Sequence, residues 1–502
     1  DPSTPDVGLE GNWIDESVAV GTDDDGFIVL DFNEAASNGT IFAATDNNAG
    51  VFCGEVLFRN ITSSGENTLD AEGFINLGFG AEYVPVTLTF VDDNTINVDW
   101  DCSGCTPAVD VITRIPDRSE VVPVEINTDI EEETTLFNLI CDPNEPDYIV
   151  TENIGVFEVL TIEPGVLIEF EANAGMTVRQ FSDGALIAKG STADPIIFTG
   201  SEKTKGYWRG LRFQTNDVRN ELDRVIVEYA GSDQLADDIN GGVNAGISID
   251  VEPGGEVARL KLTNSTIREN DGYGLAAEWF SEIAEFENNT FENNTNAAVL
   301  LETPNVAALD AASNYTGGNG YEGVEIAGNA SGNELFDNAT WPAFDDGSTY
   351  YVSRSIGVKS QLNILPGALF EFEANTFMVF EIDQFGPNDG VIIANGTSTE
   401  PITFTGFQKT AGYWRGLIIT SNSNLNNMQH CVVEYGGSDE VAGQRVNIAL
   451  DKNGAFDPPK LTITNSIIRN SAGCGIVVDQ FGGDLTQSDN TFSGNAGDDI
   501  CN

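Results

Sequence analysis

The sequence GYWRGL at residues 206–211 returns unchanged at residues 412–417. The neighbouring stretches match as well, since PIIFTG at 195–200 is answered by PITFTG at 401–406. Two successive segments of roughly 200 residues each therefore share one pattern, and such a duplication predicts a fold built from repeats.

A shorter period is visible inside each copy. Runs of alternating apolar residues such as VLIEF at 166–170 and ALIA at 185–188 recur, bounded by Gly, Asn, Asp and Pro. This pattern is typical of strands closed by tight turns, and no long segment has helical periodicity. The sequence therefore predicts an all-β solenoid of stacked strands, in which each coil buries its apolar face against its neighbours.

Asparagines follow many of these runs, among them Asn270, Asn289 and Asn294. Asn tolerates the left-handed backbone conformation that sharp turns need. In stacked coils such residues can align into ladders of side-chain amides. The alternative interpretation is that they are ordinary surface turns rich in Asn.

The order of the motifs carries a resemblance to a known architecture. GALIAKGS at 184–191, PIIFTG at 195–200, GYWRGL and VEYAG at 227–231 resemble the right-handed parallel β-helix proteins of the pectin-lyase-like type on the surfaces of Bacteroidota. The resemblance covers about residues 121–502. It implies a fold but no particular activity, because the same scaffold carries lyases, hydrolases and adhesins.

The chain divides into three predicted parts. Residues 1–118 have no counterpart in the repeats, and their short apolar runs, such as VPVTLTF at 84–90, predict a small antiparallel barrel or sandwich. The opening GNW at 11–13 is similar to the start of lipocalin-like domains, and we expect a lumen filled by side chains rather than by a ligand. Residues 119–320 and 321–502 are predicted to be the two repeats of one continuous solenoid.

The composition is strongly acidic. Eighty Asp and Glu against 22 Lys and Arg give a formal net charge of −58. A surface with this charge repels nucleic acid, anionic lipid and uronate-rich polysaccharide, and it attracts divalent cations and basic proteins. Adaptation to salty water is the favoured explanation for most of the excess.

The predicted location is the cell surface. No apolar run is long enough to span a membrane, and residues 1–6, DPSTPD, form a polar lead of the kind found at a mature N-terminus or tether. We expect an outer-membrane lipoprotein of a Gram-negative bacterium, whose acylated cysteine precedes residue 1.

The seven cysteines are an odd number, so at least one is free or bonded outside the chain. Cys102 and Cys105 have the spacing of a metal knuckle, but a disulfide between one of them and Cys53 is favoured over zinc. Cys474 and Cys501 could join the last coils, whose open end would otherwise expose strand edges.

Catalytic signatures are scarce. The single histidine, His430, excludes His-based triads repeated in both copies and sites with several His ligands. It aligns with Arg224 and is predicted to be a surface residue. The Gly-His-Gly motif of polygalacturonase-type β-helix enzymes is missing from the sequence, and few basic residues are present to act as a lyase base.

The GYWRGL motif has two interpretations. As a binding site, it would form two patches in which aromatic faces stack on sugars and Arg donates hydrogen bonds, from Tyr207, Trp208, Arg209, Tyr413, Trp414 and Arg415. As a structural element, Trp would pack on the apolar edge of a coil while Arg pairs with Glu228 or Glu434. The structural interpretation is favoured because the motif adjoins a turn that defines the fold.

Acidic turns are the other candidate sites. Asp23 with Asp25, and Asp345 with Asp346, place oxygen ligands in turns where calcium could bind. Neither turn fits a known calcium-binding pattern, so solvated acidic turns are favoured.

Three functions remain in consideration. The favoured one is a non-catalytic surface protein, an adhesin or an accessory subunit of an outer-membrane assembly, which docks a partner on the face of the β-helix. The alternatives are a surface glycan-binding protein and a polysaccharide lyase or hydrolase. Exposed aromatic residues in one place would favour glycan binding, and converging carboxylates with a raised pKa would favour an enzyme.

Overall fold

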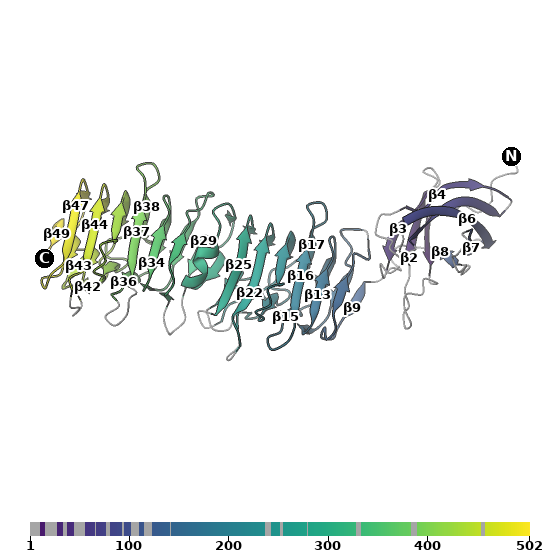
Figure 1. Cartoon of the computed structure of the whole chain (residues 1–502), viewed down its shortest axis with the longest axis horizontal. Helices are drawn as coiled ribbons and strands as arrows, with labels where there is room; N and C mark the ends of the chain where they lie inside the picture. Colours follow the sequence, from purple (N-terminus) through teal and green to yellow (C-terminus); the bar gives the residue numbers. More distant parts are fainter. Residues whose placement is uncertain are drawn as a thin grey trace.

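The computed structural model describes most of the chain. The described residues are 11–15, 28–33, 38–44, 56–65, 67–76, 81–92, 95–101, 110–114, 123–140, 142–235, 242–251, 255–278, 280–327, 333–382, 389–452 and 457–502. Within these ranges the protein is almost entirely β-sheet and consists of a small barrel followed by a long rod of stacked coils (Figure 1). The predicted all-β fold, a parallel β-helix preceded by a small antiparallel β domain, is confirmed.

The barrel has eight antiparallel strands. They are β1 (Gly11–Asp15), β2 (Ile28–Asn33), β3 (Asn38–Ala44), β4 (Val56–Ser63), β5 (Thr68–Asn76), β6 (Ala81–Asp92), β7 (Thr95–Trp100) and β8 (Asp110–Arg114). Each pairs with the next, and β1 closes the barrel by pairing with β8. Trp13 of the GNW motif is fully buried, and its ring meets Phe32 and Phe90 edge to face at centroid distances of 6.4 and 6.3 Å. Large side chains thus occupy the interior.

The first half of the rod has three parallel sheets, and each coil contributes one strand to each sheet. The first six-stranded sheet contains β10 (Thr134–Leu136), β13 (Val159–Ile162), β16 (Ala185–Lys189), β19 (Glu221–Asp223), β22 (Ala258–Thr263) and β25 (Ser281–Glu287). The first eight-stranded sheet contains β9 (Val124–Ile126), β11 (Tyr148–Val150), β14 (Leu167–Phe170), β17 (Ile196–Gly200), β20 (Val225–Glu228), β23 (Thr266–Arg268), β26 (Thr290–Glu292) and β28 (Asn314–Gly317).

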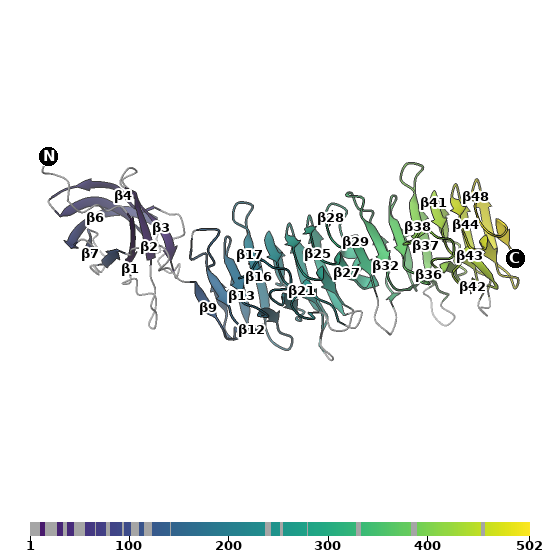
Figure 2. The ribbon, with the colours of Figure 1, turned by 180° about the vertical axis from the view of Figure 1, so that it is seen from behind.

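One sheet of thirteen strands runs through both halves (Figure 2). Its strands are β12 (Asn153–Val156), β15 (Gly175–Val178), β18 (Leu211–Phe213), β21 (Ala245–Ile249), β24 (Tyr273–Ala277), β27 (Ala297–Leu301), β29 (Tyr321–Ile326), β32 (Thr349–Val352), β35 (Leu369–Phe372), β38 (Ile402–Gly406), β41 (Cys431–Glu434), β45 (Ile467–Arg469) and β48 (Thr491–Ser493). The two halves are therefore one continuous solenoid.

Two new sheets complete the second half. The second eight-stranded sheet contains β30 (Glu334–Leu335), β33 (Ile356–Val358), β36 (Phe377–Phe380), β39 (Gly416–Ile419), β43 (Gln444–Leu450), β46 (Cys474–Val478) and β49 (Ile500–Cys501), with β42 (Glu440–Val441) antiparallel to β43. The second six-stranded sheet contains β31 (Ala339–Trp341), β34 (Gln361–Ile364), β37 (Val391–Asn395), β40 (Asn427–Gln429), β44 (Lys460–Thr464) and β47 (Asp484–Ser488). A short 3-10 helix, η3 (Thr303–Ala308), lies between the halves and contacts β25, β30 and β31.

The core is built by stacking like residues along the rod axis. Ile168 of β14 lies in register with Phe198 of β17, and both side chains are fully buried. In the second half Phe370 and Phe404 occupy the same positions, and their rings stack at a centroid distance of 5.3 Å. The alternation of inward and outward residues follows from the two-residue period of a strand.

The predicted asparagine ladder is confirmed. The side-chain nitrogen of Asn270 donates to the side-chain oxygen of Asn294 at 3.0 Å, and Asn294 donates in turn to Asn319 at 2.9 Å. All three are buried. Other turn asparagines, including Asn288 and Asn293, adopt the left-handed conformation, with φ of 54° and 52°.

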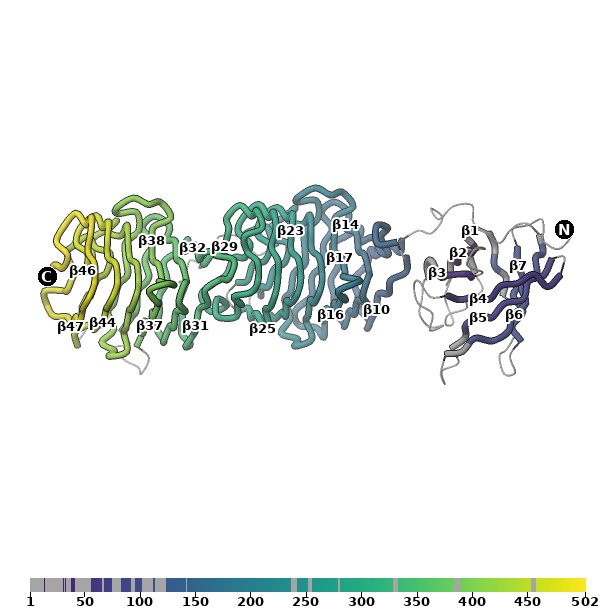
Figure 3. The backbone as a smooth tube through the Cα atoms, turned by 90° about the horizontal axis from the view of Figure 1, so that it is seen from above, coloured from purple at the N-terminus to yellow at the C-terminus, as the bar shows by residue number. Residues whose placement is uncertain are grey.

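The two copies occupy different sheets. The strand before the first GYWRGL motif, β17, lies in the first eight-stranded sheet, whereas its equivalent β38 lies in the thirteen-stranded sheet. The second copy is thus displaced by one sheet around the coil. Because twisted sheets wind along the rod, the loops after β17 and β38 still project from the same side (Figures 1 and 3).

Candidate functional site

Both motif tryptophans belong to the core. Trp208 and Trp414 are fully buried, and their rings stack on Phe170 and Phe372 at centroid distances of 4.0 and 4.1 Å. The indole nitrogen of each donates to a backbone carbonyl, that of Glu228 or Glu434, at 2.8 Å. A sugar cannot stack on these rings, so the binding interpretation is wrong for the tryptophans and their structural role is supported.

The motif arginines pair with a different acid from the one expected. A guanidinium nitrogen of Arg209 lies 3.5 Å from a carboxylate oxygen of Asp233, and Arg415 has the same distance to Asp439. The expected partner Glu228 is instead bound by Arg268 at 2.8 Å. The prediction was wrong because Asp233 lies on the turn that passes over the motif, whereas Glu228 lies on the strand.

Glu434 in the second copy behaves like Glu228. The side chain of Arg469 lies 2.5 Å from it, and the hydroxyl of Thr405 donates to it at 3.0 Å. The motif arginine Arg415 therefore has no part in this buried pairing, and it reaches the backbone carbonyl of Glu440 at 3.2 Å instead.

The motif tyrosines are half-buried and donate to carboxylates. The hydroxyl of Tyr207 lies 3.3 Å from Glu171, and that of Tyr413 lies 2.6 Å from Glu373. Burial raises the pKa of Tyr413 to about 12, with a further contribution from Glu373. Tyr413 consequently stays protonated and donates at neutral pH.

A group of aromatic residues distinguishes the second copy. Tyr321, Tyr351 and Phe407, which we call the aromatic patch, come from β29, β32 and the loop after β38. Their ring centroids are 5.0 Å apart for Tyr321 and Tyr351, 5.2 Å for Tyr351 and Phe407, and 6.1 Å for Tyr321 and Phe407. Phe407 is 43% exposed. The coil stacking therefore brings together residues that lie far apart in the sequence.

The sequence did contain a signal for this patch. Tyr351 stands where the first copy has Ile149, and Phe407 stands where it has Ser201. The strands around these positions are otherwise closely matched. Two outward positions of one face are therefore aromatic in the second copy and not in the first.

The acidic turn at Asp345 and Asp346 is used for structure. The carboxylate of Asp346 accepts the backbone amides of Tyr315 and Ser348 at 2.7 and 2.9 Å, while Asp345 is exposed. Among the described residues no three His, Cys, Asp or Glu side chains converge in a way that would hold a metal ion. The other predicted calcium turn, with Asp23 and Asp25, lies outside the described residues.

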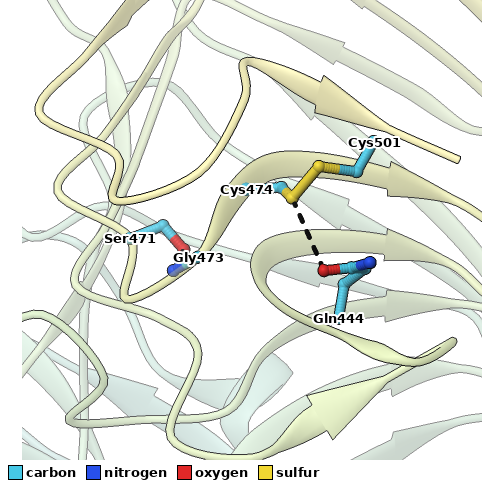
Figure 4. The surroundings of a disulfide bond; sticks show 5 residues. All are labelled: Gln444, Ser471, Gly473, Cys474 and Cys501. Carbon is cyan, nitrogen blue, oxygen red and sulfur yellow. Dashed lines mark hydrogen bonds between the residues drawn. A yellow bond between two sulfur atoms is a disulfide. The ribbon is translucent and has the colours of Figure 1, made fainter.

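The structure joins Cys474 to Cys501, the pair expected from the sequence, and so ties β46 to the last strand β49 (Figure 4). Cys53, Cys102 and Cys105 lie outside the described residues. Cys431 is buried, and burial raises its pKa to about 12, so its thiol is a poor nucleophile.

His430 lies on a turn outside the core. Its backbone is left-handed, with φ of 47°, and the equivalent Arg224 has φ of 52°. The two residues thus share a turn position rather than a chemical role.

Two carboxyl groups of the described residues have raised pKa values, and both have structural partners. Burial raises the pKa of Glu381, and the nearby Glu334 adds to the effect. The ammonium of Lys359 lies 2.6 Å from Glu334 and 3.7 Å from Glu381, so a cation bridges the two acids. Asp147, the other such group, is enclosed beneath the first coils, where its oxygens accept three backbone amides.

Exposed apolar side chains gather at the equivalent corner of the coils in the two halves of the rod, where the chain enters a six-stranded sheet. Seven of the eleven large apolar side chains that are exposed on the described rod lie in turns that enter a six-stranded sheet, and we call them the apolar edge: Phe181, Val218, Val257, Phe280, Phe336, Leu425 and Phe481. The remaining four, Val124, Leu365, Phe407 and Ile467, lie elsewhere. Phe181 is 77% exposed and Phe481 73%.

The apolar edge carries a repeated signal in the sequence. Gln-Phe occurs at residues 180–181, 384–385 and 480–481, each time followed within a few residues by Gly and Asp, and residues 384–385 lie outside the described part of the chain. Beside the first of these turns the surface is hollowed by about 450 Å³, and Phe181, Gln214 and Glu256 line the hollow. An aromatic ring at the rim of a polar hollow is a feature of binding surfaces.

No protein-family model, no curated protein and no solved structure matches this chain. In the described part of the chain, the structure contains no helix with the length and apolar character needed to cross a bilayer.

Proposed function

We propose that this chain is a non-catalytic cell-surface protein, an adhesin or an accessory subunit of an outer-membrane assembly, which docks a partner protein along the apolar edge. The observation that carries the proposal is the concentration of exposed apolar side chains on this one corner in both copies of the repeat. Exposed apolar side chains that recur at one position of successive coils differ from the singly scattered ones of an ordinary surface, and exposed apolar patches mark interaction sites.

The exposed side chains of the apolar edge can contribute to binding when a partner covers them. Burying one aromatic or branched side chain stabilises a complex by roughly 1.5–3 kcal/mol. Phe181 and Phe481 are the most exposed side chains of the apolar edge, so their burial by a partner would remove the most apolar surface from water. Aromatic residues of this kind are the usual anchors of protein interfaces.

The charge argues for a protein partner. Asp183 and Glu256 flank Phe181, and the chain as a whole carries a formal charge of −58. An anionic bilayer or nucleic acid would be repelled, whereas a protein with an apolar strip and basic surroundings would be attracted.

The surface location is part of the same proposal. The Cys474–Cys501 disulfide supports an oxidising compartment outside the cytosol. We further propose that the rod belongs with the pectin-lyase-like surface β-helices of Bacteroidota, that the barrel is lipocalin-like, and that a lipid anchors the chain to the outer membrane.

Glycan binding is the second candidate. It is favoured by the exposed ring of Phe407 next to Tyr351. The tryptophans of the GYWRGL motif, on which the prediction of glycan binding was based, are buried in the core and cannot contact a sugar. An enzymatic role gains nothing from Glu381 and Asp147, because a lysine bridges the one and backbone amides hold the other.

The test is purification of the native protein from its own membranes in mild detergent, followed by identification of proteins recovered in fixed ratio. We expect a stoichiometric partner, whose capture falls at least tenfold with Phe181→Ser combined with Phe481→Ser. Leu365→Ser is the matched control, because Leu365 is 38% exposed on another corner. Recovery of the protein alone, or equal loss with the control, would refute the proposal.

A further inference from the structure

The aromatic patch is joined to a set of carboxylates by hydrogen bonds. The hydroxyl of Tyr351 donates to Glu373 at 2.5 Å, and the hydroxyl of Tyr321 donates to Glu371 at 2.9 Å. With the bond from Tyr413, Glu373 accepts two tyrosines, one on each oxygen. Three tyrosine protons are thus committed to two carboxylates on one surface.

This arrangement leaves acceptors but few donors. Each tyrosine has one hydroxyl proton, and in Tyr321, Tyr351 and Tyr413 it already points at a carboxylate. The remaining lone pairs on the tyrosine and carboxylate oxygens can only accept. Apart from the ammonium of Lys409, which pairs with Glu371, the polar atoms of this surface therefore favour a ligand that donates hydrogen bonds.

The charge of the surface points in the same direction. Burial alone would raise the pKa of Glu373, but the hydrogen bonds from Tyr351, Tyr413 and the Ala374 amide outweigh it and lower the pKa, so the carboxylate is ionised. The ammonium of Lys409 lies 2.7 Å from the neighbouring Glu371 and pairs with that carboxylate.

We propose that the aromatic patch, together with Glu371 and Glu373, binds an arginine or lysine side chain from a basic segment of the partner protein. The cation would lie on the outer faces of Phe407 and Tyr351, where the ring quadrupoles attract it, and would donate to the acceptor oxygens beside them. Arginine fits best, because its planar guanidinium stacks on rings and carries five donors.

The spacing of the three rings determines whether a cation could be enclosed between them, as in an aromatic cage, or could only lie on their outer faces, as on a platform. Centroids 5.0 to 6.1 Å apart leave no space for a cation between the rings. The rings therefore form a platform on which a flat group can lie. A neutral sugar could also stack there, but its hydroxyls need donors as well as acceptors, and the tyrosines have none left to offer.

The first copy supplies a natural comparison. Glu169, Glu171 and Tyr207 repeat the polar part of the surface, and Lys203 lies 3.0 Å from Glu169. Ile149 and Ser201 replace the two aromatic rings. The acidic groups alone are thus present in both copies, whereas the platform is present in one.

The inference rests on the proposed docking function but concerns a different corner of the rod. The loop that carries Phe407 connects the thirteen-stranded sheet to the second eight-stranded sheet, away from the apolar edge. If a partner is recovered from the membranes and its capture is unchanged by Tyr351→Ile with Phe407→Ser, this inference fails while the docking function stands.

The experiment measures binding of a short acetylated peptide of alternating glycine and arginine at about 0.15 M salt, where the general acidic field is screened. The variant Tyr351→Ile with Phe407→Ser gives the second copy the residues of the first and leaves the net charge unchanged. We expect about a tenfold rise in Kd, the size of a partly shielded cation–π contact. A citrulline version of the peptide, which is neutral, should bind the wild-type protein at least tenfold more weakly.

A second variant and a stability measurement distinguish loss of binding from misfolding. Glu373→Gln keeps the size of the side chain and should also weaken peptide binding, with Tm recorded for every variant. Equal affinity of the peptide for wild type and for Tyr351→Ile with Phe407→Ser would overturn the inference. Binding of a neutral oligosaccharide that depends on Tyr351 and Phe407, without binding of the peptide, would assign the platform to a glycan instead.

Discussion

The two copies of the repeat agree in the packing around the GYWRGL motif and differ in the aromatic residues of one outer surface. Trp208 and Trp414 make the same hydrogen bond at 2.8 Å, and Arg209 and Arg415 lie at the same 3.5 Å from their acids. On the outside, Tyr351 and Phe407 of the second copy have no aromatic counterpart in the first. Packing requirements explain the residues that the two copies share. A binding site is therefore best sought at the positions where the two copies differ.

The displacement between the copies strengthens this lesson. The equivalent strands β17 and β38 belong to different sheets, yet the contacts around the two tryptophans are the same. The motif thus carries its own local packing and does not depend on which sheet continues beside it. The GYWRGL motif is therefore a structural element of the solenoid.

Replacing each tryptophan in turn tests whether the packing around Trp208 and around Trp414 contributes equally to stability. Trp208→Ala and Trp414→Ala should each lower the free energy of unfolding by about 3–5 kcal/mol, because a fully buried ring and its hydrogen bond are lost. Denaturant unfolding of both variants measures the effect. Losses that differ by more than about twofold would contradict the equivalence of the two sites.

Asp147 tests a difference in the interior, because Thr349 stands at the equivalent place in the second copy. Burial raises the pKa of Asp147 to about 6, against the opposing hydrogen bonds from the amides of Ile140, Leu167 and Leu139. Its ordinary pKa in an unfolded chain is about 3.9. The folded state therefore binds the extra proton between these values, and Asp147 makes the protein more stable as the pH falls from about 6 to about 4.

The measurement compares the wild-type protein with Asp147→Asn across that pH range. The stability of the wild type relative to the variant should rise by roughly 2–3 kcal/mol as the pH falls. Both proteins share the titration of the other acids, which cancels in the difference. A difference that is independent of pH would show that the amide hydrogen bonds outweigh burial.

The interior was the more predictable part of the molecule. The repeated GYWRGL motif, the alternating runs and the turn asparagines are local patterns, and they correctly predicted stacked parallel strands and an amide ladder around Asn270 and Asn294. The structural role of Trp208 followed from its place beside a turn. Stacking repeats the same environment in each coil, so one short pattern carries information about many positions.

The exterior was predicted poorly, for physical reasons. The acid that meets Arg209 depends on the path of a turn, which spacing along the chain does not determine, and Asp233 rather than Glu228 lies there. Tyr321, Tyr351 and Phe407 meet only because the four coils that contain β29, β32, β35 and β38 stack. Comparing the copies residue by residue, and asking where outward positions differ, would have found two of these three rings.

The decisive measurement is the number of arginine-containing peptides that one chain binds, by calorimetric titration of the wild type and of Tyr351→Ile with Phe407→Ser. The difference between the copies predicts one site that requires arginine in the wild type, and none in the variant. Two equivalent sites in the wild type would mean that the acidic groups shared by both copies suffice, and an unchanged site in the variant would place binding elsewhere. Either result would contradict the assignment of binding to the surface on which the copies diverge.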